Sequence, residues 1–470
     1  MEVDVVVIGS GAAGLTTAVV AAQAGLKVLV TEKAKYYGGT TAYSLGAPWI
    51  IANPHQKSMG LDDEARAGDL YLRSTLGNLY NAEKVAAYIE SGAEMIAYME
   101  ANTGVRWRGT VIPDYFPDAE GFRFGRMLLT REYDGSVLGP YLRQLRLPLP
   151  GFSVFGSMQV DYMDVDKLKA TFKSPAAFLF TTRKLLAYVR DLARFGRGAY
   201  LANGNALVGG LLRSALDAKV ELWRSAPAVR LVTEEGAVRG VVIDRDGRLV
   251  TVRARRGIVL ASGGFGASAE LRAKYIPYPE EHISVQPEEN VGDGIRLGQE
   301  AGGVLGELNP ENGVWAPVSV IRRKDGSIDK YPHFGPDRGK PGSIIVDSRG
   351  ARFVDEATPY QPFVHAMHER GITTAYFIGD RKFLRSYGMG FAFPAPYPIH
   401  SFIRAGYLIE APTIGALAAK LGIDPTSLEQ TVAEFNKHAR QGADPMFHRG
   451  ANIYDKRNET AGIRRFEDDD

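Results

Sequence analysis

The amino-terminal stretch constrains the fold more than any other part of the chain, because a glycine-rich turn joins two apolar runs there. Residues 2–33 read EVDVVVIGSGAAGLTTAVVAAQAGLKVLVTEK. Residues 3–8 are mostly β-branched, which is typical of a parallel strand buried on both faces. Residues 15–24 are small and apolar, as in a helix packed on a sheet, and Gly25 stands where such a helix ends. With a second strand at residues 27–31, this order predicts an α/β domain with a parallel sheet.

The glycines of the run GSGAAG, at residues 9–14, stand where a dinucleotide-binding turn requires them. Gly9 allows the tight turn, Gly11 lets a pyrophosphate approach the backbone, and Gly14 lets the helix pack close to the strand. The first turn of the helix would direct N–H groups at the phosphates. Glu32 stands at the spacing of a carboxylate that binds a ribose 2′-hydroxyl, which disfavours NADP. The pattern leaves NAD and FAD open, and a glycine turn without a ligand is the alternative.

The rest of the chain divides by composition into a first domain at residues 1–277 and a second domain at residues 278–465. Within the first domain, residues 63–103 have a helical pattern, and an insertion of loops and helices follows at about residues 105–200. The elements expected after the insertion are a helix that begins at Asn203, strands at residues 221–223, 228–233, 238–243, 249–254 and 256–264, and helices at residues 411–421 and 425–441.

The composition excludes several classes of function. A formal net charge of +2 and an isoelectric point of about 8.4 give no basic footprint for nucleic acid. The chain contains no cysteine, which rules out disulfides, thiolate catalysis and cysteine-bound metals and fits a reducing cytoplasm. Residues 12–30 are apolar, but no basic segment precedes them and glycines interrupt them, so we expect neither a signal peptide nor a membrane span. We therefore expect a cytoplasmic protein.

Further motifs resemble a superfamily of FAD-dependent enzymes that includes fumarate reductase, succinate dehydrogenase and 3-ketosteroid dehydrogenase. They are GGTT at residues 38–41, ASGGFG at residues 261–266 and NVGDG at residues 290–294. They favour FAD over NAD. The resemblance implies an α/β fold, with a Rossmann-like FAD-binding domain of the glutathione reductase type and an inserted α+β substrate domain. The residues that it implies as FAD contacts are Gly9, Gly11, Ala12, Ala13, Gly14, Glu32, Lys33, Gly39, Thr40, Thr41, Ser44, Gly46, Val229, Ala261, Ser262, Gly263, Gly264 and Asp293.

Within this superfamily the chain resembles the 3-ketosteroid dehydrogenases over nearly its whole length, and least clearly at residues 125–200. The matching segments are GAPW at residues 46–49, PDYFP at 113–117, NGNAL at 203–207, GARFVDE at 350–356 with PY at 359–360, EFN at 434–436 and FHRG at 447–450. A fumarate reductase carries an arginine soon after the Arg-Phe motif, whereas residues 357–362 read ATPYQP. A neutral, apolar ketone therefore fits better than a dicarboxylate, and fumarate or succinate chemistry is the alternative. The histidine that tethers flavin in some relatives has no counterpart in residues 38–49, so we expect FAD to bind non-covalently.

The resemblance implies desaturation beside a ketone, in which a base removes an α-proton and the β-hydrogen leaves as hydride to the flavin. It assigns the base to Tyr360 and a supporting role to Tyr115. A phenol can be held over an apolar substrate without a permanent charge, although its reference pKa of about 10 requires assistance. The alternative for each tyrosine is a ring packed in the core with a backbone-bonded hydroxyl. The implied partners are a small, steroid-like ketone and an electron acceptor that the sequence does not identify.

Other side chains have competing interpretations. His365 and His368 lie on one face of an expected helix and could bind a metal, but no third ligand accompanies them, so we expect helix surface and no metal site. Arg352 and Glu356 are expected to form a structural ion pair. A helix at residues 176–195, opened by Ser174-Pro175, carries basic and apolar residues that could contact a membrane peripherally. Burial of its apolar residues against the domain core is the favoured interpretation.

The 3-ketosteroid dehydrogenases continue beyond the point that matches Tyr454-Asp455, with a further flavin-contacting strand and helix and a Tyr-Pro-Gly-x-Gly segment. Residues 456–470 match neither part, so we expect the carboxyl-terminal return to the FAD domain to be missing. A truncated flavoprotein that binds FAD weakly and catalyses nothing is therefore another alternative. The sequence specifies neither the oligomeric state nor the exact ketone.

Overall fold

The computed structural model describes residues 1–161, 164–278, 282–306, 309, 312–323, 325–334 and 337–456. The chain forms two compact units. Unit 1 comprises Met1–Asp69, Leu79–Thr110 and Gly125–Gly313, and unit 2 comprises Leu70–Asn78, Val111–Phe124 and Val314–Asp470. The main division thus follows Gly313, whereas composition placed a boundary at residue 277. Asn290 and Asp293 remain in unit 1, where they line the same cleft as the amino-terminal glycine turn.

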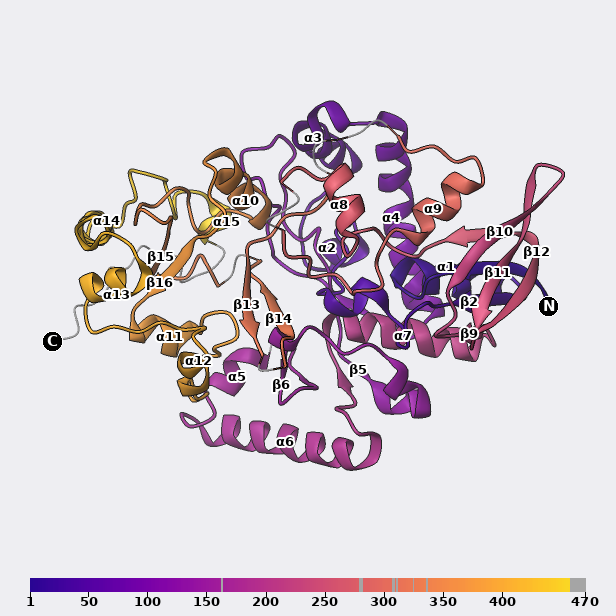
Figure 1. The fold of residues 1–470 in the computed structure, drawn as a ribbon, viewed down its shortest axis with the longest axis horizontal. Helices are drawn as coiled ribbons and strands as arrows, with labels where there is room; N and C mark the ends of the chain where they lie inside the picture. Colours follow the sequence, from indigo (N-terminus) through magenta and orange to yellow (C-terminus); the bar gives the residue numbers. More distant parts are fainter. Residues whose placement is uncertain are drawn as a thin grey trace. The chain divides into compact units, whose positions relative to one another are not determined.

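Unit 1 is built on a six-stranded sheet in the order β10-β11-β12-β1-β2-β9 (Figure 1). The strands are β1 (Glu2–Ile8), β2 (Val28–Thr31), β9 (Glu221–Trp223), β10 (Ala228–Glu234), β11 (Ala237–Arg245) and β12 (Arg248–Leu260). β1 runs parallel to β2 and β12, while β10, β11 and β12 form an antiparallel ribbon. The two strands expected at residues 249–264 form the single strand β12, which has a register shift where β1 passes from Val3 to Val5.

Both faces of the central strands are buried, as their β-branched sequences predict. Val5 and Val7 of β1 pack with Leu15 of α1 (Ala12–Gln23) and Leu211 of α7 (Asn203–Asp217). Val3, Val6 and Ile8 point to the opposite face, into a second cluster that contains Leu297 of α9 (Asp293–Glu300). This two-sided core fixes the carboxyl ends of β1, β2 and β12, where the chain turns away from the sheet.

The remaining elements of unit 1 are short, apart from two helices of 21 residues each. The helices are α2 (Pro54–Ser58), α4 (Ala82–Asn102), α5 (Val165–Lys169), α6 (Pro175–Phe195) and α8 (Ala269–Tyr275), with 3-10 turns at Gly39–Tyr43, Gly135–Gln144 and Pro150–Phe152. The short strands are β3 (Trp107–Arg108), β4 (Leu129–Thr130), β5 (Tyr133–Asp134), β6 (Ser153–Val154), β7 (Met158–Gln159) and β8 (Tyr200–Leu201). Helix α3 (Ala65–Leu76) and the 3-10 turn Gly77–Leu79 include residues of both units.

The expectation that α6 buries its apolar side chains against the domain core is wrong. The helix begins at Pro175 and ends before Gly196 as expected, but its large apolar side chains are exposed, with Leu186 at 65% and Val189 at 60%. Its opposite face is polar and holds the helix against the protein by hydrogen bonds and an ion pair. Ser174 precedes the helix but makes no side-chain cap bond.

Unit 2 combines small sheets with short helices. The strands pair as β13 (Val318–Arg322) with β14 (Ile328–Pro332) and β15 (Ser343–Val346) with β16 (Tyr376–Gly379). The helices are α10 (Tyr360–Glu369), α11 (Arg381–Tyr387), α12 (His400–Arg404), α13 (Ile414–Leu421), α14 (Pro425–Ala439) and α15 (Ile453–Lys456). Ile344 and Ile378 of the β15–β16 pair pack against Leu428 and Phe435 of α14. No helix in the described part of the chain is long and apolar enough to cross a membrane.

Candidate functional site

A cleft in unit 1 opens at the carboxyl ends of the parallel strands, where Ile8, Thr31 and Leu260 are the last residues of β1, β2 and β12. Ligands of open α/β sheets bind at this edge. The lining residues are Ile8, Gly9, Ser10, Gly11, Ala12, Ala13, Thr31, Glu32, Lys33, Gly39, Thr40, Thr41, Arg146, Ala228, Ala261, Ser262, Gly263, Pro287, Glu289, Asn290 and Asp293. Segments distant in sequence thus meet around the first turn of α1.

Two glycines of the first turn are required by their neighbours within the protein. Gly9 has φ +111°, and a Cβ there would overlap the Ala261 carbonyl. A Cβ on Gly14 would overlap the Gly9 carbonyl, so α1 can pack this close to β1 only without a side chain there. Gly11 differs from these two glycines. A Cβ added there would lie 3.4 Å from the Thr41 Oγ1 atom, its nearest neighbour, which is an ordinary van der Waals separation. Gly11 therefore lies beside space that a phosphate could enter.

The loop at residues 38–41 closes another side of the cleft. Gly38 and Gly39 have φ values of +117° and +48°, and the 3-10 turn Gly39–Tyr43 begins there. The Thr41 Oγ1 atom accepts a hydrogen bond from the Ala12 backbone N–H at 2.9 Å. This bond joins the loop to the amino terminus of α1, so the two segments that sequence assigned to the cofactor form one surface.

The Glu32 carboxylate is buried and fixed by backbone and side-chain donors. One oxygen accepts bonds from the Ser10 N–H at 3.1 Å and the Ser10 hydroxyl at 2.5 Å, and the other accepts from the Ala34 N–H at 2.9 Å. The Gly38 N–H donates to the Ser10 hydroxyl oxygen at 3.0 Å. Glu32 thus holds the glycine turn and lines the cleft at the same time.

Charged pairs complete the rim of the cleft. The Lys33 Nζ atom lies 2.8 Å from the Asp293 Oδ2 atom. The Arg146 Nη2 atom lies 2.9 Å from the Glu289 Oε2 atom. The sequence analysis missed Arg146, because it lies in the loop-rich insertion, more than 100 residues from the first glycine motif. The Arg146 guanidinium also lies over the Tyr43 ring, 5.7 Å from its centroid. No local pattern marks this arginine.

The polar atoms of the cleft fit a polar ligand. Among the described residues, the Ser262 Oγ, Asn290 Oδ1 and Arg146 Nε atoms are buried and have no hydrogen-bond partner in the protein. All three residues line the cleft. A buried polar atom without a partner costs about 1–3 kcal/mol, so these atoms favour a ligand that supplies both donors and acceptors. A dinucleotide does so through its phosphates, ribose hydroxyls and ring atoms.

The predicted FAD contacts fall into two groups. Those that line the cleft are Gly9, Gly11, Ala12, Ala13, Glu32, Lys33, Gly39, Thr40, Thr41, Ala261, Ser262, Gly263 and Asp293. Those outside its lining are Gly14, Ser44, Gly46, Val229 and Gly264. Of the second group, Ser44 accepts a bond from the Gly46 N–H and donates to the Thr41 carbonyl, and Val229 is 38% exposed. Direct contact of any of these residues with FAD stays a prediction.

Unit 2 brings together the two tyrosines that the resemblance implicated. The Tyr115 hydroxyl donates to the Tyr360 oxygen at 3.4 Å, and the rings meet edge to face with centroids 5.7 Å apart. Tyr454 packs on Tyr115 at 5.7 Å, and Phe334 packs on Tyr360 at 5.3 Å. We call these four residues the tyrosine cluster. Two half-buried hydroxyls therefore lie side by side within an aromatic surface.

The turn before Tyr360 is held by a buried arginine. Tyr360 is the first residue of α10, and the carbonyls of Glu356 and Thr358 just precede it. Arg338 donates to each of these carbonyls at 3.0 Å, and its guanidinium lies 4.4 Å from the centroid of the Phe363 ring. Burial lowers the pKa of Arg338 to about 10, so the side chain stays charged at neutral pH. Arg338 is therefore a positioning residue for Tyr360.

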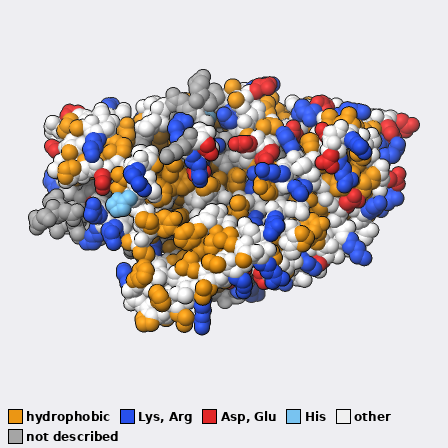
Figure 2. Space-filling model, turned by 60° about the horizontal axis from the view of Figure 1, so that its bottom comes forward, with side chains coloured by type: hydrophobic (Ala, Val, Ile, Leu, Met, Phe, Trp, Pro, Cys, Tyr) orange, Lys and Arg blue, Asp and Glu red, His pale blue; other side chains and the backbone are white. Residues whose placement is uncertain are grey.

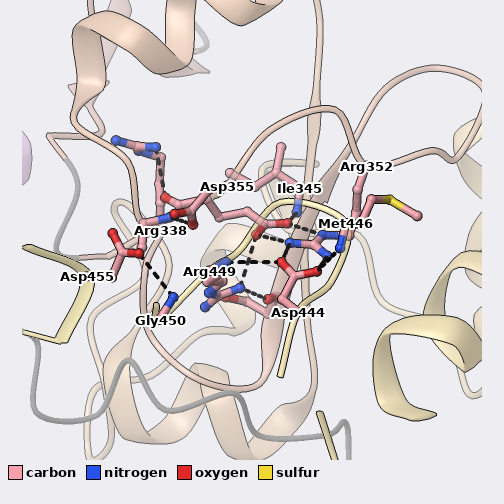
Figure 3. Close-up of polar contacts among 12 residues, drawn as sticks. Arg338, Ile345, Arg352, Asp355, Asp444, Met446, Arg449, Gly450 and Asp455 are labelled. Atoms are coloured by element: carbon pink, nitrogen blue, oxygen red, sulfur yellow. Dashed lines mark hydrogen bonds and ion pairs between the residues drawn. The ribbon is translucent and has the colours of Figure 1, made fainter. Parts of the chain in front are cut away.

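A buried ion network continues from this turn (Figure 3). Arg352 binds Glu356 with two bonds of 2.7 Å and binds Asp444 at 2.8 and 3.0 Å. Arg449 reaches Glu356 at 3.3 Å and donates to the Ser343 and Lys340 carbonyls. Burial alone would raise the pKa of Glu356, but the two arginines outweigh it and hold the pKa below its ordinary value. The expected Arg352–Glu356 ion pair is confirmed.

Asp355, which is half-buried, and Asp455, which is buried, form an acidic pair beside the network (Figure 3). Asp355 accepts from the Ala357 N–H at 2.8 Å, and Asp455 accepts from Gly450 N–H at 3.0 Å and Asn452 Nδ2 at 2.9 Å. Burial and the negative charge of Asp455 raise the pKa of Asp355 to about 8. Burial also raises the pKa of Asp455. The pair therefore holds a proton at neutral pH.

The two histidines of α10 are half-buried and differ in their neighbours. His368 meets Trp315 edge to face at 5.0 Å, and His365 lies 3.4 Å from the Gln361 amide. In the described part of the chain, no three acidic, histidine or cysteine side chains are grouped so that they could hold a metal ion.

Comparison with known proteins identifies the family. A family model described as "FAD binding domain" matches residues 4–464. The chain belongs to this family. The 4-oxocyclohex-2-ene-1-carboxylate 5-dehydrogenase of Sinomonas cyclohexanicum is 37% identical over 461 residues, covering 96% of this chain and 77% of that protein. The 3-oxosteroid 1-dehydrogenase of Mycobacterium tuberculosis strain H37Rv is 32% identical over 484 residues, covering 97% and 82%.

A solved structure has the same fold. The 3-ketosteroid delta1-dehydrogenase from Sterolibacterium denitrificans, in complex with 1,4-androstadiene-3,17-dione, aligns with a TM-score of 0.85 and 30% identity. The alignment covers 100% of this chain and 86% of that chain. The predicted fold class and the resemblance are confirmed, and the chain is an FAD-dependent oxidoreductase.

Proposed function

We propose that this FAD-dependent oxidoreductase desaturates a ring ketone of the 3-ketosteroid type, with Tyr360 as the base and Tyr115 as its hydrogen-bond donor. The observation that carries the proposal is the hydroxyl pair at 3.4 Å within an aromatic surface. Relatives named for oxosteroids and for oxocyclohexene carboxylates share a six-membered ring ketone as substrate, which supports this chemistry. A flat, apolar ring suits contact with aromatic side chains.

The reaction needs a proton acceptor and a hydride acceptor. Tyr360, as phenolate, takes the α-proton of the ketone and becomes a phenol. The electron pair of that C–H bond forms the new C=C bond as the β-hydrogen departs with its own pair. FAD, when bound, supplies the two-electron acceptor for that hydride. Tyr115 has the supporting role, because its hydroxyl donates to the Tyr360 oxygen, the atom that would take the proton.

The arginines near the turn support a neutral substrate. Arg338 and Arg449 donate to backbone carbonyls, and Arg352 binds Glu356 and Asp444. Side chains already held by such buried partners are poor candidates for binding a dicarboxylate. Fumarate or succinate chemistry is therefore the less favoured alternative.

Tyr360→Phe is the decisive test. The purified wild-type protein should show a flavin absorption band that a 3-ketosteroid bleaches without oxygen and that succinate does not bleach. The variant should keep the band and be reduced roughly 100-fold more slowly, because a positioned general base contributes at least that factor. The matched control is Tyr376→Phe, which changes another half-buried tyrosine of unit 2 outside the cluster.

Each contrary result has a separate meaning. Unchanged reduction of the Tyr360→Phe variant would rule out this base. Bleaching by 4-oxocyclohexanecarboxylate and not by the steroid would retain the chemistry and replace the substrate class. A purified chain without a flavin band would favour the inactive flavoprotein that binds FAD weakly.

A further inference from the structure

Helix α6 presents an apolar face to solvent. The α6 patch consists of the exposed side chains Phe172, Phe178, Leu179, Leu185, Leu186, Val189 and Leu192. Figure 2 shows hydrophobic side chains, with lysine and arginine beside them, gathered on the face of unit 1 that carries α5 and α6. The spacing of residues 178, 185, 189 and 192 places these side chains along one stripe of the helix. Contiguous exposed apolar surface of this kind marks an interaction site.

The orientation of α6 is inverted relative to an ordinary surface helix, whose apolar face turns inward. Lys184 forms a 2.6 Å ion pair with Asp164, and the Tyr188 hydroxyl donates to the Phe155 carbonyl at 2.7 Å. Asp191 accepts a bond from the Ala199 N–H at 3.0 Å, and the Thr181 hydroxyl lies 2.7 Å from that of Thr171. Polar contacts with its own unit thus anchor the helix while the apolar stripe faces outward.

Positive charge borders the patch. Arg183, Arg190 and Arg194 are exposed on α6, and Lys167 and Lys173 are exposed just before it. Asp191 is the one acidic residue in the sequence of α6, and its side chain is only 5% exposed. Arg190 forms an ion pair with Asp191 at 2.9 Å, and the remaining exposed charges of the helix, on Arg183 and Arg194, are positive.

We propose that the α6 patch docks this enzyme on the surface of an anionic lipid bilayer. An exposed apolar stripe beside basic residues is the pattern of a helix that lies in the plane of a membrane interface. The leucine, valine and phenylalanine side chains would enter the acyl boundary, while the arginines and lysines would meet anionic headgroups. A protein partner or a second copy would need complementary acidic groups, which α6 itself does not expose. This docking proposal does not depend on which ketone the enzyme desaturates.

Vesicle co-sedimentation of the whole protein tests the proposal. Wild-type protein should sediment with vesicles that contain phosphatidylglycerol, more weakly with phosphatidylcholine alone, and less with the anionic vesicles as salt is added. Leu186→Ser combined with Val189→Ser should lower partitioning roughly tenfold, because two exposed apolar side chains no longer enter the acyl boundary. The control is Leu249→Ser on the β11–β12 ribbon, where the native leucine is 69% exposed; partitioning should not change.

A second pair of variants separates charge from apolar contact. Arg183→Gln combined with Arg194→Gln should lower binding to the anionic vesicles roughly tenfold and leave binding to phosphatidylcholine unchanged. Arg239→Gln, an exposed arginine of β11, is the matched control. An unchanged flavin band and circular dichroism spectrum would show that each variant is folded.

A spectroscopic measurement locates the contact. Because the chain contains no cysteine, Ala193→Cys can carry a single environment-sensitive fluorophore beside the patch. Anionic vesicles should shift its emission to the blue, and the same label at Leu249→Cys should not respond. The proposal is overturned if wild-type protein ignores anionic vesicles, or if the Leu186/Val189 variant binds them as wild type does. A dimer that this variant dissociates, without any vesicle binding, would assign the patch to a second copy.

Discussion

The cleft of unit 1 is shaped by close backbone approach at glycines, whereas the tyrosine cluster of unit 2 is positioned by buried charged side chains. At the cleft, Gly9 and Gly14 are the places where a single Cβ would collide with a carbonyl. At the cluster, Arg338 binds the carbonyls that lead into Tyr360, and Arg352 and Arg449 hold Glu356. The first arrangement leaves no room for a Cβ at Gly9 or Gly14, and the second depends on the charges of its arginines.

The largest expected effect tests the cleft. Gly14→Val should abolish FAD binding, because its Cβ would overlap the Gly9 carbonyl and force α1 away from β1. Flavin content after purification and FAD titration of the apoprotein measure this loss, which we expect to exceed 100-fold in affinity.

Gly306→Ala is the control for this prediction. A Cβ at Gly306 meets nothing within 4 Å, and this glycine lies outside the lining of the cleft. The variant should retain FAD. If Gly14→Val binds FAD as wild type does, close approach at the glycine turn is not what shapes the cleft.

The glycine turn was predictable from sequence because its requirement is local. The spacing of Gly9, Gly11 and Gly14 and the strand before them contain the information, and the structure places them at the sheet edge as expected. Arg146 and Arg338 were not predictable in this way. Arg146 meets Glu289, and Arg338 meets Glu356 and Thr358, across more than fifteen residues of chain, so only the folded structure brings them to these partners.

Helix α6 shows a different limit of sequence patterns. Its periodicity correctly predicted an amphipathic helix, but periodicity does not tell which face packs on the protein. Hydrogen bonds and an ion pair from Lys184, Tyr188 and Asp191 decide the orientation. A general preference for burying the apolar face gave the wrong result here.

The second prediction tests the charged support of the tyrosine cluster. Arg338→Met keeps the length of the side chain but removes its donors to the Glu356 and Thr358 carbonyls. We expect a loss of about 3 kcal/mol in the free energy of unfolding, because buried groups lose their partners. The rate of flavin reduction by a ring ketone should fall while KM changes little, since the turn that carries Tyr360 loosens.

The control for this prediction is Arg349→Met. The Arg349 side chain is 79% exposed and pairs with Asp347, so its loss should cost less than about 1 kcal/mol. Chemical denaturation of both variants and stopped-flow reduction of their flavin measure the contrast. Equal stability and equal rates in the two variants would contradict a positioning role for Arg338.

The third prediction concerns the acidic pair beside the same network. Because the pKa of Asp355 is raised to about 8, from 3.8 for an ordinary aspartate, the folded state keeps a proton that the unfolded chain releases. Stability must then fall as the pH rises from about 4 to about 8, by at most about 1.4 kcal/mol per pH unit. Asp355→Asn removes this titration and keeps an oxygen for the Ala357 N–H.

The difference in the free energy of unfolding between Asp355→Asn and wild type should therefore increasingly favour the variant as the pH rises from about 4 to about 8. Asp347→Asn is the matched control, because the pKa of Asp347 is shifted in the opposite direction to that of Asp355. Burial would raise the pKa of Asp347, but bonds from Ala351 and Arg349 outweigh it and lower the pKa, so its stabilisation is lost only at acid pH. Denaturant unfolding at about pH 5 and about pH 8 distinguishes the two. Parallel curves for wild type and Asp355→Asn would show that the acidic pair holds no proton, and that the charge supporting the tyrosine cluster comes from the arginine network alone.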